Sequence, residues 1–324
     1  MKEVIAIIGL SKNAGKTTYL NWFISKSYFK RYGVTSTGRD GEDVDLVTAK
    51  KKPKVVLPPN TLFTSFDYIS EQNPSGLKVI EKLPFRVVGK NIWLYLTTQS
   101  TETEIVGPST LNEQIELIKI FNALKCDFVL IDGSIDRKSI CLSDKITEIT
   151  LVIGAAAGSI NEITQQTEKI KLISEIPTQK IKDYEYITYK TNKIIKSNIK
   201  TIYSNESEIN NIITKQPKWV YFPGMLTSNS WQKLKNMISN YSGDIIFNHP
   251  ININLNLSEL NQFIKKSIYS RQHFPIKTVA INSFSPNEEY IDANILRGKI
   301  KDMFQGFKVL DTMELGVKKM RIVN

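Results

Sequence analysis

The stretch AIIGLSKNAGKTTYLNWF, residues 6–23, joins an apolar strand to a helix through a loop framed by two glycines. Residues 9–17 end in Gly15-Lys16-Thr17 as the phosphate-loop pattern G-x-x-x-x-G-K-[ST] does, but five residues rather than four separate Gly15 from Gly9. Glycines let such a loop bend so that successive backbone N–H groups point inward, and the helix N-terminus adds positive potential. The stretch therefore predicts a strand–loop–helix unit that binds the phosphates of a nucleotide.

The residues of this loop have separate expected roles. In phosphate loops the lysine, here Lys16, reaches the β- and γ-phosphates and acts in catalysis, while the hydroxyl after it, here Thr17, coordinates Mg²⁺. Thr18 is positioned to reach the α-phosphate. The predicted nucleotide-binding residues are Gly9, Lys12, Asn13, Ala14, Gly15, Lys16, Thr17 and Thr18.

An acidic residue at the end of a neighbouring strand normally holds the Mg²⁺ or its water. Asp132 fits this role because it follows the apolar run Phe128–Ile131, and Asp136 is a second candidate. We therefore expect Asp132 to be a metal ligand and a catalytic residue.

A second acidic segment, TSTGRDGEDVDLV at residues 35–47, directly follows the second predicted strand. In nucleotide-hydrolysing folds this position often carries a residue that contacts the metal or positions water. Asp40 is the first candidate for a catalytic and metal-binding role there, and Glu42 and Asp45 come next. A solvated turn would have a similar composition, so both interpretations stay open.

Two further loops allow two interpretations each. Gly107–Ser109 either lines a pocket beside the γ-phosphate or forms a plain turn, and the small residues 154–159 either let a ligand approach closely or form a packing turn. The segment TNKII, residues 191–195, begins like the guanine-reading motif Asn-Lys-x-Asp but ends in Ile195. Because an aliphatic side chain cannot accept hydrogen bonds from guanine, the sequence favours ATP over GTP.

Predicted strands and helices alternate along almost the whole chain, which is typical of an α/β fold with a mostly parallel sheet. The alternation is lost in the polar stretch 180–216 and resumes after Pro217. We therefore expect a P-loop NTPase domain over residues 1–216 and a smaller α/β C-terminal domain over residues 217–324.

Composition narrows the classes of partner. The chain of 324 residues has a net charge of +11, but its basic residues are scattered over both halves. Nucleic-acid binding is therefore not expected, and a surface for an acidic partner protein explains the charge at least as well. Two cysteines and two histidines disfavour a metal site with nitrogen and sulfur ligands, while Mg²⁺ on oxygen ligands stays open.

No apolar run reaches the roughly 20 residues needed to cross a bilayer. The first residues lead straight into a strand without a leader pattern, so we expect a cytoplasmic protein.

Three of these features together resemble a known group of phosphate-loop proteins. The phosphate loop, the acidic segment and the turn LIDGS at residues 130–134 are similar to those of dethiobiotin synthetase, cobyrinic acid diamide synthase and the molybdopterin-guanine-dinucleotide adapter. Partition-type ATPases of this group carry a second lysine directly after the first glycine, where this chain has Leu10. Its additional lysine is Lys12, so a signature-lysine mechanism is not expected.

A narrower resemblance covers most of the chain. It is carried by IGLSKNAGKTT, TSTGRDGEDVDLVTAKKKP, EIVGPST, DFVLIDGSIDRKS and INSFSP. These segments resemble the reactivating ATPase subunit of the lysine 5,6- and ornithine 4,5-aminomutases, which depend on cobalamin and pyridoxal phosphate. The resemblance implies an ATP-driven factor that works with a partner ATPase similar to mismatch-repair proteins. The two would exchange damaged cobalamin for fresh adenosylcobalamin on the inactivated mutase.

Two other functions stay open. A small-molecule synthetase of the dethiobiotin or cobyrinate type would transfer the γ-phosphate to a carboxylate, which Arg39 and Lys12 could hold. A nucleotide-binding regulatory protein would bind without turnover. The oligomeric state is open as well, although related nucleotide switches often form homodimers face to face across ATP.

Overall fold

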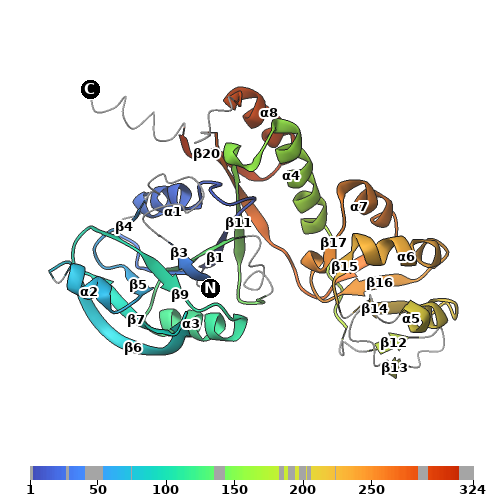
Figure 1. Ribbon diagram of the computed structural model, residues 1–324, viewed down its shortest axis with the longest axis horizontal. Helices are drawn as coiled ribbons and strands as arrows, with labels where there is room; N and C mark the ends of the chain where they lie inside the picture. The colour runs from blue at the N-terminus through green and yellow to red at the C-terminus, as the bar shows by residue number, and fades with distance from the viewer. Residues whose placement is uncertain are drawn as a thin grey trace. The chain divides into compact units, whose positions relative to one another are not determined.

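The computed structural model describes residues 3–26, 29–40, 54–73, 75–134, 143–181, 186–188, 194–196, 202, 206–222, 224–283 and 291–313. The chain divides into two compact units. Unit 1 combines Met1–Thr164 with Pro275–Asn324, and unit 2 is Gln165–Phe274. Each unit contains both strands and helices (Figure 1). None of the helices in those ranges combines the length and the apolar character that crossing a bilayer requires.

Unit 1 is built on a sheet of nine strands in the order β20-β19-β11-β1-β10-β2-β5-β7-β6. The strands from β20 to β5 run parallel, whereas β7 is antiparallel to both β5 and β6. Their bounds are β1 (Glu3–Gly9), β2 (Tyr32–Ser36), β5 (Leu62–Ser65), β6 (Leu77–Val87), β7 (Lys90–Thr97), β10 (Phe128–Ser134), β11 (Glu148–Gly154), β19 (Ile276–Asn282) and β20 (Lys308–Asp311). This α/β architecture with a mostly parallel sheet is the class expected from the sequence.

Helices and short strands surround this sheet. The helices are α1 (Lys16–Ser25), α2 (Tyr68–Gln72), α3 (Leu111–Ala123), α8 (Ala293–Met303) and the short η3 (Ala155–Ala157). A further helix, α4 (Ile160–Ser174), begins in unit 1 and ends in unit 2. Two small sheets pair β3 (Gly38–Asp40) with β9 (Ile105–Gly107) and β4 (Val55–Leu57) with β8 (Thr101–Thr103).

The central strands are apolar because both faces of a parallel sheet are covered. Every residue of β1 after Glu3 is buried, and α1 packs Leu20 and Ile24 into the same core. Burial raises the pKa of Tyr19 on α1 to about 12, and its hydroxyl accepts a hydrogen bond from Thr150 of β11. The first helix is therefore fixed to the middle of the sheet.

Unit 2 has its own sheet, in the order β13-β12-β14-β16-β18. The strands β14, β16 and β18 are parallel, and β12 is antiparallel to β13 and β14. The bounds are β12 (Tyr186–Thr188), β13 (Ile194–Lys196), β14 (Trp219–Phe222), β16 (Asp244–Phe247) and β18 (Ile268–Ser270), with β15 (Leu226–Thr227) paired to β17 (Ile253–Asn254). The helices are α5 (Glu206–Ile213), α6 (Ser228–Ser239), α7 (Leu257–Phe263) and the short η4 (Pro250–Asn252).

The division of the chain differs from the one expected at residue 216. Strand β19 pairs with β11, and β20 pairs with β19, so the last part of the chain completes the sheet of unit 1 (Figure 1). Unit 2 is therefore an insertion between β11 and β19 rather than the first part of a C-terminal domain. Local patterns could not reveal this, because the pairing joins Gly154 to Asn282 across the whole of unit 2.

Candidate functional site

The glycine-framed loop, residues 9–18, lies at the carboxyl end of β1 in the middle of the unit 1 sheet. The Leu10 N–H donates to the Val152 carbonyl oxygen at 2.8 Å, which fixes the start of the loop to β11. Asn13 has a φ of 62° and Gly15 a φ of 96°, so the chain bends sharply before α1. Strand β1 lies between two strands that come later in the chain, β10 on one side and β11 on the other. Open α/β sheets bind ligands at such a position.

Gly15 is required by its surroundings as well as by its backbone. A φ of 96° lies in the left-handed region that favours glycine, and a Cβ would lie 2.3 Å from Asn282 Nδ2. Asn282 ends β19 and is only 8% exposed. Gly154, at the end of β11, makes a second close approach, since a Cβ there would lie 2.5 Å from the Ala14 Cα. The loop is therefore packed against the ends of β11 and β19.

Helix α1 starts without the side-chain cap that other helices carry. Its N-cap is Gly15, which has no side chain that could accept from the first N–H groups, and its first turn has no acidic residue. By contrast, a side chain accepts a backbone N–H at the start of α2, α3, α4, α6, α7 and α8, from Asp67, Thr110, Ser159, Thr227, Asn256 and Asp292 respectively. Uncapped N–H groups and the positive end of the helix dipole favour an anion at the start of α1.

The predicted nucleotide-binding side chains differ in exposure. Lys12 is exposed, Lys16, Thr17 and Thr18 are half-buried, and Ala14 is fully buried. The side chain of Ala14 is part of the packing against Gly154, so this residue can offer a ligand only its main chain.

Asp132 lies on the strand next to the loop strand. In β10 it pairs in register with Ile7 of β1 and with Ser36 of β2, and it is 1% exposed. Its carbonyl oxygen accepts a hydrogen bond from the Thr37 N–H at 2.8 Å. Asp132 therefore lies near the carboxyl end of β10, beside the end of β1 where the loop begins.

Asp40 lies on a separate element. It is the last residue of β3, the short strand after β2, and it pairs with Ile105 of β9. The last described residues of the acidic segment, Gly38–Asp40, are thus paired along their whole length with β9. The other acidic candidates Glu42, Asp45 and Asp136 lie outside the described residues.

The small-residue loop after β11 forms a packing turn beside the glycine-framed loop. The Ser159 N–H donates to the Glu162 carboxylate at 2.8 Å, and the Glu162 N–H donates to Ser159 Oγ at 3.3 Å. These bonds, first of all the one from the Ser159 backbone, hold the pKa of Glu162 below its ordinary value. Because a carboxylate already caps α4, its N-terminus does not offer a second anion site.

No self-sufficient metal site is found within the described ranges, where no three His, Cys, Asp or Glu side chains gather closely enough to hold an ion. Mg²⁺ does not need such a group, since it usually takes one or two protein oxygens, several waters and substrate phosphates. Thr17 and Asp132 could supply these protein oxygens at this edge of the sheet.

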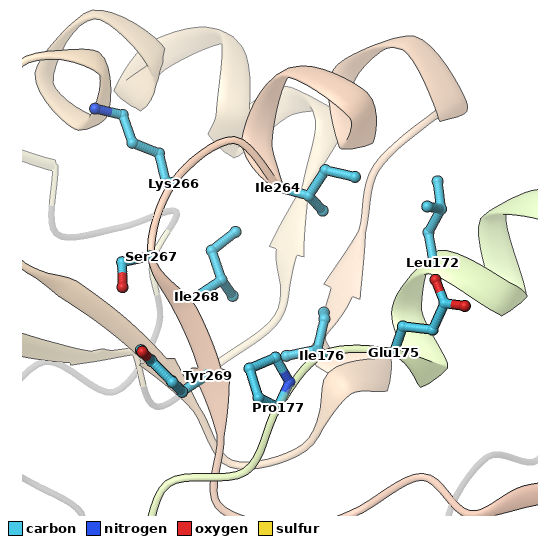
Figure 2. Close-up of a pocket in the computed structure, with 9 residues that line it drawn as sticks. All are labelled: Leu172, Glu175, Ile176, Pro177, Ile264, Lys266, Ser267, Ile268 and Tyr269. Atoms are coloured by element: carbon cyan, nitrogen blue, oxygen red, sulfur yellow. The ribbon is translucent and has the colours of Figure 1, made fainter.

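A pocket of about 340 Å³ belongs to unit 2 and is lined by the end of α4 and the segment that leads into β18 (Figure 2). Its apolar walls are Leu172, Ile176, Pro177, Ile264, Ile268 and the Tyr269 ring. Its Glu175 pairs with Lys171 at 2.8 Å. Its Lys266 Nζ donates to the carbonyl oxygens of Ser239 and Tyr241. This lining does not suit a phosphate group.

Asn282 and Gln114 also belong to this edge of the unit 1 sheet, and neither was among the predicted site residues. Asn282 lies in the segment INSFSP but had no assigned role. The signal that selected Asp132, a polar residue directly after an apolar strand, would also have selected Asn282. Gln114 lies inside a helix, and no local pattern distinguishes it.

Gly154→Ala is expected to destabilise unit 1 by about 1–3 kcal/mol, the usual cost of overpacking. The new methyl group would meet backbone atoms of Ala14, which cannot turn away as a side chain can. Gly298→Ala in α8 is the matched control, because a Cβ there meets nothing within 4 Å. The two unfolding midpoints in urea test this, and equal midpoints would contradict the packing described here.

Taken together, the sheet edge carries an uncapped helix start, a lysine and two hydroxyls in one loop, and a buried carboxylate on the next strand. Such a set can bind a phosphorylated anion together with a divalent cation. No protein-family model matches this chain, and no curated protein or solved structure matches it either.

Proposed function

We propose that the Gly9–Thr18 loop binds ATP with Mg²⁺ and that this chain is a P-loop NTPase that hydrolyses ATP. The observation that carries the proposal is the uncapped start of α1 behind a loop that ends in Gly15-Lys16-Thr17, at the carboxyl end of a mostly parallel sheet. The first N–H groups of a helix have no intrahelical partner, and here phosphate oxygens would accept from them.

The side chains at the loop divide the work of binding. The Lys16 ammonium holds the β- and γ-phosphates, and Thr18 reaches the α-phosphate. Thr17 and Asp132 would hold the cation, directly or through its water. Bound Mg²⁺ would neutralise negative charge on the nucleotide phosphates.

In hydrolysis a water oxygen bonds to the γ-phosphorus while the bond to the β–γ bridging oxygen breaks, and ADP and phosphate leave. Lys16 stabilises the negative charge that these phosphate oxygens carry. Asp40 is the proposed third catalytic residue, because its strand follows the end of β2, which is hydrogen-bonded to the Asp132 main chain through Thr37.

We further infer that this hydrolysis reactivates a cobalamin- and pyridoxal-phosphate-dependent aminomutase. The support is the resemblance of the loop, the acidic segment and the segments around Asp132 and Asn282 to the reactivating ATPase subunit. The chain would act in the cytoplasm with a partner ATPase similar to mismatch-repair proteins, alone or as a homodimer across ATP. A net charge of +11 would draw it toward an acidic partner surface.

Reconstitution of an inactivated aminomutase tests this function. The chain alone should hydrolyse ATP slowly, because a repair motor without a client would waste nucleotide. The partner ATPase and the inactivated mutase together should raise turnover, by about 10³- to 10⁵-fold if the partner supplies an arginine to the transition state. Mutase activity should return when adenosylcobalamin and ATP are present, and fully active mutase is the control that should not stimulate turnover.

The same assay separates the two competing functions. A synthetase would release ADP in proportion to a new product when a small carboxylate or amine is added without any partner protein. A regulatory protein would bind ATP and show no turnover in any mixture. Either result would overturn the reactivase proposal while leaving nucleotide binding in place.

A further inference from the structure

Gln114 connects two strand ends at the edge of the sheet where Asp132 lies. It is in the first turn of α3 and is 1% exposed. Its amide Nε2 donates to the carbonyl oxygen of Ser36 at 2.8 Å and to that of Pro108. Ser36 ends β2 and Pro108 follows β9, so both hydrogens of one amide group join these two ends.

Gly107, the last residue of β9, lets the end of β9 pack directly against the end of β2, and we call this contact the junction of β2 and β9. A Cβ on it would lie 2.0 Å from the Ser36 carbonyl oxygen and 2.2 Å from Thr35 Oγ1. No side chain fits there, so β9 lies directly against the end of β2. The place of β9 in turn sets the place of β3, because Asp40 pairs with Ile105.

The end of β2 is also joined to the strand of Asp132. The Thr37 N–H donates to the Asp132 carbonyl oxygen at 2.8 Å, and Ser36 Oγ donates to the Gly38 carbonyl oxygen at 2.8 Å. Hydrogen bonds therefore run without a break from the backbone of Asp132, through the end of β2, to Gln114 and β9. Both acids of the proposed site lie on segments that this junction connects.

The carbonyl end of the Gln114 amide takes no part in these hydrogen bonds. Its Oε1 is buried and finds no hydrogen-bond partner in the described part of the chain. A buried acceptor without a partner opposes folding, and such atoms are few in native proteins. Holding two carbonyl groups at a fixed separation is a reason to retain the amide in spite of this.

We propose that Gln114 is a positioning residue for ATP hydrolysis, which holds β9 against β2 so that β3 brings Asp40 to the edge where Asp132 lies. This inference rests on the ATPase function proposed above. The hydrogen bonds of Gln114 go to Ser36 and Pro108 and not to the nucleotide loop. Its loss should therefore reduce turnover and leave ATP affinity unchanged.

Gln114→Met tests this, because methionine has a similar volume and lacks the amide. Its kcat for ATP hydrolysis should fall about tenfold, as for other groups that orient a catalytic residue, while the Kd for ATP·Mg²⁺ stays the same. Hydrogen exchange gives a second readout that needs no activity. Amides of residues 38–40 and 105–107 should exchange about tenfold faster, and those of residues 10–18 should not change.

Gln166→Met is the matched control, since Gln166 is exposed on α4 and the same change there should alter neither readout. Gly107→Ala attacks the junction by a second route and should also lower kcat without weakening binding. It decides the question if Gln114→Met does not fold. If the variants that fold keep the wild-type kcat or the wild-type exchange rates, the positioning role is wrong.

Wild-type protein separates this failure from that of the proposed function. If wild-type protein binds and hydrolyses ATP while the junction variants behave like it, only the role of Gln114 falls. If wild-type protein does not bind ATP·Mg²⁺ at all, the proposed function falls and the role of Gln114 falls with it.

Discussion

Replacing Lys16 with alanine is expected to weaken ATP·Mg²⁺ binding by about 1.5–3 kcal/mol, or about 10- to 150-fold. The reason is the loss of a charge-assisted hydrogen bond to the β- and γ-phosphates, while the main-chain N–H groups of the loop remain. Lys16 is half-buried at the start of α1, so its loss should not disturb the core. Isothermal titration calorimetry measures the change directly.

Lys119→Ala is the control for the loss of one positive charge. Lys119 is on α3, with a side chain that is 67% exposed, and pairs with the exposed Glu116 at 3.7 Å. Its replacement should leave ATP affinity unchanged. Equal affinities of wild-type protein and a folded Lys16→Ala variant would show that the loop does not bind nucleotide phosphates.

Replacing Asp132 with asparagine is expected to lower ATP turnover about 10- to 100-fold, the usual effect of removing a group that orients or holds a metal ion. Asparagine keeps the shape of the side chain in a strand where Asp132 is 1% exposed, so the fold should survive. It removes the negative charge that holds Mg²⁺ or its water. Much of the nucleotide affinity should remain, because Lys16 and the loop are unchanged.

Initial rates at increasing Mg²⁺ concentrations test this expectation. The variant should need more Mg²⁺ for half-maximal rate and should reach a lower maximum. Asp144→Asn is the control, since Asp144 is exposed and its side chain pairs with the neighbouring, half-exposed Lys145. A wild-type rate in Asp132→Asn at saturating Mg²⁺ would remove Asp132 from the proposed site.

Local features of the fold could be predicted from the sequence, whereas long-range pairings could not. The apolar run of β1 and the glycine turn before α1 are short-range signals, and the hairpin of β6 and β7 turns at Gly89 with a φ of 75°. The place of β19 beside β11 depends on a pairing across unit 2, which no window of sequence contains. This is why the last part of the chain was expected in a separate domain.

The candidate site divides in the same way. The loop and Asp132 could be predicted because each lies directly after an apolar run that marks its strand in the sequence. The contact of Asn282 with Gly15 depends on the order of the strands, and the two hydrogen bonds of Gln114 join segments that are far apart in sequence. The segment 191–195, which resembled a guanine-reading motif in part, belongs to unit 2, where Ile194 and Ile195 begin β13.

Hydrogen exchange with and without ATP·Mg²⁺ tests most directly whether a nucleotide binds at the start of α1. The N–H groups of residues 11–18 should be protected strongly by ATP·Mg²⁺, and the same amides in Lys16→Ala should need a higher ATP concentration for the same protection. Amides of β14 and β16 in unit 2 serve as an internal reference and should not change. Saturating ATP·Mg²⁺ that leaves residues 11–18 unprotected would contradict the account.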